Sequence, residues 1–439
     1  MSEGTEATKI LGEEPDERQL TLARRVFGIL GPGLVTGAAD DDPSGIATYS
    51  QVGAQFGYSM GWTMTFAFPL MAAIQEVSAR IGATTGHGIA NNLRRHYPRW
   101  LLDVLVLSLF IANTINLGAD LGAMAAALHL LIVGPTALYI VAFALLCALL
   151  EIFIRYSRYV SVLRWLTLSL FAYVGTVFVV GVPWLTVARD LVLPDIKVSG
   201  DYFTVIVAVF GTTISPYLFF WQAGEEVEDE QEDPAAKPLV DAPDEAPRQI
   251  VRMEADTIVG MGFSNIIALF IMLTTAATLH AHGVTNIETS AQAAEALRPI
   301  AGPLTFTIFA LGIIGTGLLT VPVLAGSAAY AVGEALRWRV GLTQRPGRAP
   351  AFYATIAVAT LIGALLNFSP LDPIKALFWS AVINGVAAVP IMVMIMLMAS
   401  RKQVMGQFTL RPLLASLGWL ATAAMAIAAV GMFATWGST

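Results

Sequence analysis

Asp42-Pro43-Ser44-Gly45 interrupts the first long apolar segment of this chain, and Thr213-Ile214-Ser215-Pro216 interrupts the sixth. Proline removes a backbone donor, so the turn before it contains carbonyl groups without partners. At membrane depth such backbone is stable only where it lines a polar cavity or binds an ion. Matching interruptions in two halves of a membrane protein indicate a substrate site of a transporter, so these two stretches decide both the fold and the expected site.

The composition around these stretches is that of an integral membrane protein. Of the 439 residues, 56% are hydrophobic and only 13% are charged, which is too apolar for an ordinary soluble domain. The apolar runs reach the roughly 20 residues that a helix needs to cross a hydrocarbon core of about 30 Å. They are too long for the strands of a membrane barrel, so an all-α fold is expected. The single cysteine, Cys147, excludes a disulfide within the chain.

Eleven transmembrane helices are expected. The polar segment 1–25 precedes them and lacks the apolar core of a secretory signal, so we expect a cytoplasmic tail and insertion directed by the first helix. The helices are placed at residues 26–52, 58–80, 101–131, 135–154, 159–183, 203–223, 256–281, 303–333, 352–369, 373–399 and 413–436.

The basic residues support this count. With the N-terminus in the cytoplasm, 21 of the 25 Lys and Arg residues fall on the inside, and an excess of this kind is the usual guide to orientation. The four on the outside are Arg189, Lys197, Arg298 and Lys375. We therefore expect a multi-pass protein of the cell membrane with an extracellular C-terminus.

Two five-helix units of opposite orientation follow from this topology. Residues 26–183 form the first and residues 203–399 the second, which includes an acidic cytoplasmic loop at 224–255; the helix at 413–436 is appended. Helices 1 and 6 are the discontinuous ones, as in a 5+5 inverted repeat. A helical channel could also contain broken helices, but two inverted halves joined by a long loop favour alternating access.

Several motifs resemble the natural resistance-associated macrophage protein (Nramp) family of divalent-metal transporters. They are Gly31-Pro32-Gly33, Asp42-Pro43, Gln55-Phe56-Gly57-Tyr58 and Ser78-Ala79-Arg80. The resemblance implies the leucine-transporter (APC) fold with eleven or twelve helices. It also implies a metal site made by an Asp-Pro-Gly-Asn motif on helix one and a Met-Pro-His motif on helix six.

The chain departs from that implied site. Ser44 and Gly45 stand where the family has Gly and Asn, while Ser215 and Tyr217 stand for Met and His. A thioether favours manganese, iron and later transition metals, whereas hydroxyl, carboxylate and carbonyl oxygens suit magnesium, calcium or manganese. Magnesium keeps several waters and binds few carboxylates. The pattern is similar to the Nramp-related magnesium transporters, a branch of the family.

The expected metal site therefore consists of oxygen ligands and space for a partly hydrated ion, Mg²⁺ or Mn²⁺, which is the substrate and not a cofactor. Asp42 is the principal ligand, and Asp120 follows Asn116 by one helical turn on the same face. Successive helical residues point about 100° apart, so Asp40 and Asp41 are expected in the vestibule or in hydrogen bonds. The expected site residues are Asp42, Gly45, Thr212, Ser215, Asp120 and Asn116.

Proton coupling is not expected. The resemblance implies a carboxylate pair on helix three and histidines on helix six for this purpose. Asn116 and Ala119 stand at the first pair of positions, and Tyr217 and Gln222 at the second; none titrates near neutral pH.

Other functions remain open as alternatives. The nearest is a proton-coupled Mn²⁺ or Fe²⁺ importer. A Na⁺-coupled amino-acid transporter shares the broken helices, but a carboxylate at the break disfavours it. An enzyme is not expected, because the sequence contains no Ser/His/Asp cluster, phosphate loop or His-Glu-x-x-His motif. The expected partners are the metal ion and the lipid bilayer, without nucleic acid; the oligomeric state stays open.

Overall fold

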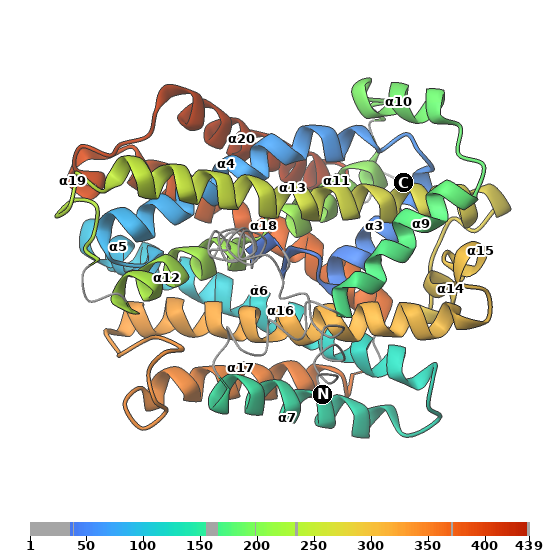
Figure 1. Ribbon diagram of the computed structural model, residues 1–439, viewed down its shortest axis with the longest axis horizontal. Coiled ribbons are helices and arrows are strands. Elements are labelled where there is room, and N and C mark those ends of the chain that lie inside the picture. Colours follow the sequence, from blue (N-terminus) through green and yellow to red (C-terminus); the bar gives the residue numbers. More distant parts are fainter. Residues whose placement is uncertain are drawn as a thin grey trace, which may run out of the picture.

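The computed structural model describes residues 36–37, 39–154, 166–197, 199–232, 236–369 and 372–436, and every regular element in these ranges is helical (Figure 1). The predicted tail, the first ten residues of the helix expected at 26–52 and the beginning of the one expected at 159–183 lie outside the described residues. The longer helices are α3 (Pro43–Phe56), α4 (Trp62–Thr85), α6 (Arg99–His129), α7 (Thr136–Phe153), α9 (Phe171–Val179), α11 (Gly200–Thr213), α12 (Pro216–Glu232), α13 (Ala246–Thr278), α16 (Thr305–Leu336), α17 (Pro350–Leu366), α18 (Pro373–Ala399) and α20 (Pro412–Ala434).

Seven segments of the described chain are long and apolar enough to cross a membrane, if α11 and α12 count as one. They are Arg99–His129, Thr136–Phe153, Gly200–Gln231, Ala246–His282, Arg298–Leu336, Pro373–Ala399 and Pro412–Ala434. An eighth is possible if Leu168–Val179 and Trp184–Val192, which meet at 119°, form one span. The described residues thus support a multi-pass membrane protein, and the count of eleven stays a prediction.

Both interruptions have a defined local structure. Asp42 is extended, with φ −71° and ψ 168°, and caps α3, whose first residue is Pro43. In the sixth segment α11 ends at Thr213, Ile214 leaves the helical region with φ −122° and ψ 58°, and α12 begins at Pro216. A proline at the first helical position loses no intrahelical hydrogen bond, which explains why each helix restarts there.

Glycines allow close contacts between the helices around these breaks. A Cβ at Gly211 of α11 would lie 2.0 Å from the Ala381 carbonyl oxygen of α18. One at Gly118 of α6 would lie 2.7 Å from the Gly363 carbonyl oxygen of α17. Since apolar lipid provides no hydrophobic force between helices, such backbone contacts are a main source of packing energy in a membrane.

The run Glu225–Asp233, expected within a solvated loop, differs from that expectation. Residues 224–232 continue α12, and residues 246–255 belong to α13. Glu228 explains part of the difference, because its carboxylate accepts hydrogen bonds from the Leu342 and Thr343 amides, at 2.6 and 3.0 Å, and from the Tyr330 hydroxyl. These hydrogen bonds hold the C-terminal part of α12 against the connection between α16 and α17.

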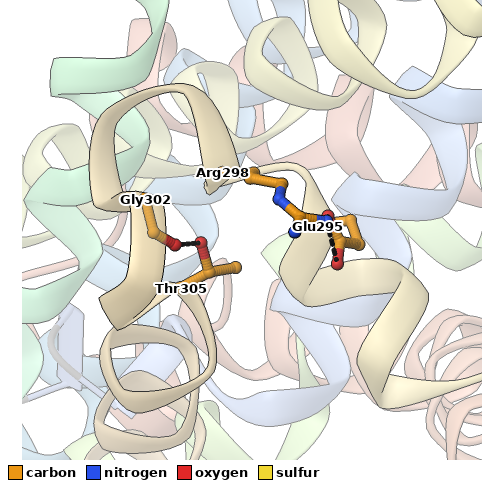
Figure 2. Close-up of polar contacts among 4 residues, drawn as sticks. All are labelled: Glu295, Arg298, Gly302 and Thr305. Carbon is orange, nitrogen blue, oxygen red and sulfur yellow. Dashed lines mark hydrogen bonds and ion pairs between the residues drawn. The ribbon is translucent and has the colours of Figure 1, made fainter.

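Short helices lie at the two ends of the long ones (Figure 1). At one end are α10 (Trp184–Val192), α14 (Ser290–Glu295) and α15 (Arg298–Ala301); at the other are α5 (Ile89–His96) and α19 (Lys402–Met405). Figure 2 shows the contacts around α15: Arg298 pairs with Glu295 at 2.8 Å, and the Thr305 hydroxyl donates to the Gly302 carbonyl at 2.7 Å. Gln51 of α3 contacts the segment that precedes α14, because its Oε1 accepts a hydrogen bond from the Ile287 amide at 2.8 Å.

Candidate metal-binding site

Asp42 lies at the centre of the candidate site, where the first span is interrupted. Its side chain is buried and accepts hydrogen bonds from the Gly45 amide at 2.5 Å and the Ser44 hydroxyl at 2.7 Å. These bonds follow from the local sequence, since an aspartate before a helix accepts from the third residue of the first turn. The carboxylate is thereby held at the break by donors of its own first helical turn.

Asn116 connects this carboxylate to α6 and α18. Its Nδ2 donates to Asp42 Oδ2 at 3.1 Å, and its Oδ1 accepts from the Ser380 hydroxyl at 2.7 Å. The two bonds fix which way the amide points. Ser380 was not among the expected site residues, because one serine on an apolar helix gives no pattern in the sequence.

Asp120 lies one turn further along α6 and is fully buried. Neither of its carboxylate oxygens makes a hydrogen bond of good geometry within the described part of the chain, although the Ser44 backbone amide lies close enough to stabilise its charge. It is also close enough to Asp42 for the two charges to interact. An ionised carboxylate buried without a positive charge is strongly unfavourable, so this position favours a bound cation or a proton.

Gly45 and Thr212 bring α3 and α11 together beside Asp42. A Cβ at Gly45 would lie 3.1 Å from Thr212 Oγ1 and 3.2 Å from Asp42 Oδ1. Thr212 Oγ1 is buried and has no hydrogen-bond partner among the described residues. The absence of a side chain at residue 45 therefore leaves this hydroxyl and the carboxylate facing the same small space.

Ser215 has a structural role at the second break. Its hydroxyl lies 2.8 Å from the carbonyl oxygens of Gly211 and Thr212, both near the end of α11. It donates its single proton to these otherwise unpaired carbonyls, so only its oxygen lone pairs could face an ion. The structure places Ser215 next to Thr212 but shows no contact between Ser215 and Asp42.

The free carbonyl before the first break is also satisfied. Ala39 O accepts from the Tyr217 hydroxyl at 3.1 Å and lies 3.2 Å from the Thr320 hydroxyl, whose single proton is shared with Thr316 O at 3.0 Å. Tyr217 in turn accepts at its carbonyl from Ser327 at 2.8 Å. Tyr217 thus connects the two interrupted spans directly, a role that sequence reasoning did not assign to it.

Asp40 and Asp41 face α13. The Ser264 hydroxyl lies 2.6 Å from Asp40 Oδ2 and 3.0 Å from Asp41 Oδ1. The expectation that these two residues form hydrogen bonds is confirmed. Asn384 of α18 is buried too, and neither of its amide atoms has a hydrogen-bond partner among the described residues.

Four buried carboxyl groups lie in this region. Asp40, Asp41, Asp42 and Asp120 are each at most 3% exposed. None of the ion pairs in the described ranges includes any of the four. Nor does the described part of the chain contain three His, Cys, Asp or Glu side chains grouped so that they could hold a metal. An ion beside Asp42 would therefore meet oxygen atoms, few of them charged.

Three comparisons relate this arrangement to known proteins. The family described as natural resistance-associated macrophage protein-like matches residues 33–435. The divalent metal cation transporter MntH of Deinococcus radiodurans is 26% identical over 411 residues, covering 90% of this chain and 87% of the relative. MntH of Klebsiella pneumoniae is 26% identical over 414 residues, covering 91% and 92%.

Solved structures share the fold. The Eremococcus coleocola manganese transporter, in complex with an aromatic bis-isothiourea substituted compound, has a TM-score of 0.72 at 17% identity, covering 97% of this chain and 90% of that one. Mhp1, a nucleobase-cation-symport-1 family transporter, has a TM-score of 0.52 at 15% identity, covering 93% of each chain. With nearly the whole sequence matched and the fold shared, the chain belongs to the natural resistance-associated macrophage protein family.

Proposed function

We propose that this protein is a secondary transporter of divalent metal ions, with Mg²⁺ and also Mn²⁺ as substrates. The ion binds at mid-membrane between the interruption at Asp42 and the one after Thr213. Asp42 is its principal ligand; Asp120, Asn116, Thr212 and Ser215 complete the surroundings, and Gly45 provides space. The names of the MntH relatives support the substrate class.

One observation carries the proposal: Asp42 and Asp120 are buried beside an interrupted helix with no basic side chain paired to either in the described ranges. Ionisable groups within membrane segments are costly and are found at ion or substrate pathways. Two carboxylates would be neutralised by one divalent ion. The same pair disfavours the amino-acid transporter considered above, since a substrate carboxylate would be repelled there.

The donor set favours a hard, partly hydrated ion. Ser215 and Tyr217 occupy the positions at which the family resemblance implies a thioether and an imidazole, so the site lacks the soft and borderline ligands that select later transition metals. Magnesium gives up its waters reluctantly and usually retains several of them. The absence of a side chain at Gly45 removes one steric obstacle to an ion that contacts part of the site through water.

A cavity of about 370 Å³ lies between α3, α11, α18 and α20, and two of these helices, α3 and α11, also contribute Gly45 and Thr212 to the site. Its lining includes Ala47, two residues beyond Gly45, together with Gln51 and Asp201. The cavity lies at the end of these helices that the distribution of basic residues places outside the cell. We assign to it the approach of the ion in an alternating-access cycle of a 5+5 inverted repeat.

Transport is not coupled to protons in this proposal, because Asn116, Ala119, Tyr217 and Gln222 occupy the four positions at which the family resemblance implies proton-carrying side chains, and none of them titrates near neutral pH. Gln222 is instead held by a hydrogen bond, since its Oε1 accepts from Gln75 Nε2 at 2.9 Å. The membrane potential alone supplies about 4.6 kcal/mol per 100 mV for a divalent ion that moves inward, twice the value for a single charge.

Uptake into liposomes tests the proposal. The purified protein is reconstituted with a metal indicator and a pH indicator inside the same vesicles, and initial rates are compared for Mg²⁺, Mn²⁺ and Ca²⁺. We expect Mg²⁺ uptake that depends on the membrane potential and leaves the internal pH unchanged. Uptake of Mn²⁺ or Fe²⁺ that excludes Mg²⁺ and acidifies the vesicles would establish the alternative, a proton-coupled importer.

A further inference from the structure

A second cavity, of about 330 Å³, lies between α4, α13 and α20, away from the candidate metal site. Four charged side chains line it: Glu76, Arg80, Glu254 and Arg411. The rest of its wall is almost entirely apolar. A cavity with charges at one part and hydrocarbon at the other matches an amphipathic ligand.

The cavity opens on the surface that faces lipid. Leu413 and Ile258, both in its lining, are 74% and 43% exposed. Further along the same two helices, Leu420 and Val259 are 56% and 61% exposed. Large apolar side chains exposed in rows on membrane-spanning helices contact acyl chains, so the cavity is reached from the bilayer.

Two guanidinium groups provide donors for a phosphate. Arg80 is only 7% exposed at its side chain; its Nε and Nη2 contact Glu76 at 2.7 and 2.5 Å, and its Nη1 has no acceptor in the described part of the chain. Arg411 is exposed and forms no ion pair within the described ranges. It also precedes α20, whose first turn has no side-chain cap. Guanidinium groups and free helix amides are the usual partners of phosphate.

Glu254 adds the opposite charge at the same opening. Its side chain is 42% exposed, and its nearest cation is Arg80 Nη2 at 3.9 Å, which is too long for a hydrogen bond. The carboxylate can therefore accept from a further cationic donor. An anionic headgroup alone would leave this charge unmatched.

We propose that this cavity binds a phospholipid whose headgroup carries a phosphate and a primary ammonium group, as in phosphatidylethanolamine. Arg411 and Arg80 hold the phosphate, Glu254 accepts hydrogen bonds from the ammonium, and one acyl chain follows the apolar wall beside Leu413. A choline headgroup has no N–H to donate to Glu254, and a glycerol headgroup has no positive charge.

Native mass spectrometry of the full-length protein tests this assignment. Phosphatidylethanolamine, phosphatidylcholine and phosphatidylglycerol with identical acyl chains are titrated separately. We expect the ethanolamine lipid to bind most tightly, and Arg411→Gln to weaken all three by about fivefold or more through loss of a charge-assisted hydrogen bond. Glu254→Gln should reduce the preference for ethanolamine over choline without weakening the choline lipid. Lys402→Gln, an exposed change on α19, is the control.

Each outcome decides the proposal. Equal binding of the three lipids by the unaltered protein would remove the ammonium from the assignment. An Arg411→Gln variant that binds lipid as the Lys402→Gln control does would show that the phosphate lies elsewhere. Because both changes are at partly or fully exposed side chains, a thermal melt alongside the titration separates loss of lipid from loss of fold.

Discussion

Replacing Asp42 by Asn removes the charge at the proposed site while keeping a side chain of the same size. Asn caps a helix about as well as Asp, and its carbonyl oxygen can still accept from the Gly45 amide, so α3 should begin at the same residue. The NH₂ group of the new side chain would face Asn116 Nδ2, and two donors cannot form a hydrogen bond. The loss of this hydrogen bond costs about 1 kcal/mol. The fold is therefore expected to survive the change.

The expected loss of ion binding is larger. Even if one water separated them, at about 5 Å, a divalent ion and a carboxylate would attract each other by about 7 kcal/mol at an effective dielectric constant of about 20, and direct coordination brings them closer. Dehydration offsets most of this. If a fifth of the attraction remains after dehydration, about 1.4 kcal/mol, the affinity for the ion falls about tenfold when the charge of Asp42 is removed.

The matched control is Ser44→Ala. It removes the hydroxyl that donates to Asp42 at 2.7 Å and so costs a similar hydrogen bond, but it leaves the carboxylate charge in place. Mg²⁺ uptake into liposomes should show an apparent affinity at least about tenfold weaker for Asp42→Asn and nearly normal for Ser44→Ala. If both variants lose transport equally, or if Asp42→Asn retains the normal affinity, the charge of Asp42 is not what binds the ion.

Three further changes test other parts of the structure. Gly45→Ala places a methyl group 3.1 Å from Thr212 Oγ1, so it should lower the uptake rate with little change in melting temperature; uptake as fast as normal would contradict the proposed space for a hydrated ion. Gln51→Ala removes the bond to the Ile287 amide, and hydrogen exchange should rise in residues 284–297 but not in α16. The pKa of His87, between α4 and α5, is lowered by burial and by Arg95 and Arg94. As the pH falls, the unfolded chain therefore binds a proton at this histidine before the folded chain does. The free energy of unfolding should fall as the pH drops below about 6.5. His87→Gln should reduce that slope in thermal melts recorded from pH 7.5 to 5.5.

The two interruptions could be predicted because their signal is local. Pro43 and Pro216 lack the amide hydrogen that a continuing helix would use, which favours a break before each of them, and an aspartate before a proline indicates a helix cap. The structure begins α3 and α12 at those prolines. The shared face of Asn116 and Asp120 likewise follows from helical periodicity alone, although only Asn116 forms a hydrogen bond with Asp42.

What the sequence did not reveal depends on how helices are rotated against one another. Ser264, Thr320 and Ser380 are small hydroxyl residues on largely apolar helices, and nothing in their spacing indicates that they face Asp40, Ala39 and Asn116. The extension of α12 was missed for a related reason. Its carboxylates predict repulsion in isolation, but Glu228 accepts backbone hydrogen bonds from a segment more than a hundred residues away.

These hydroxyl groups also limit what the protein can offer an ion. The carbonyls freed by the two breaks are the ligands that a dehydrated ion would use, yet Ala39 O already lies within hydrogen-bond distance of two hydroxyls, and Gly211 O and Thr212 O lie against Ser215. What remains beside Asp42 is the Thr212 hydroxyl and the distal Asp120 carboxylate, too few for six-fold coordination. An ion at this position must fill its shell with water, which disfavours ions that need direct soft ligands and suits Mg²⁺, whose hydration is hardest to remove.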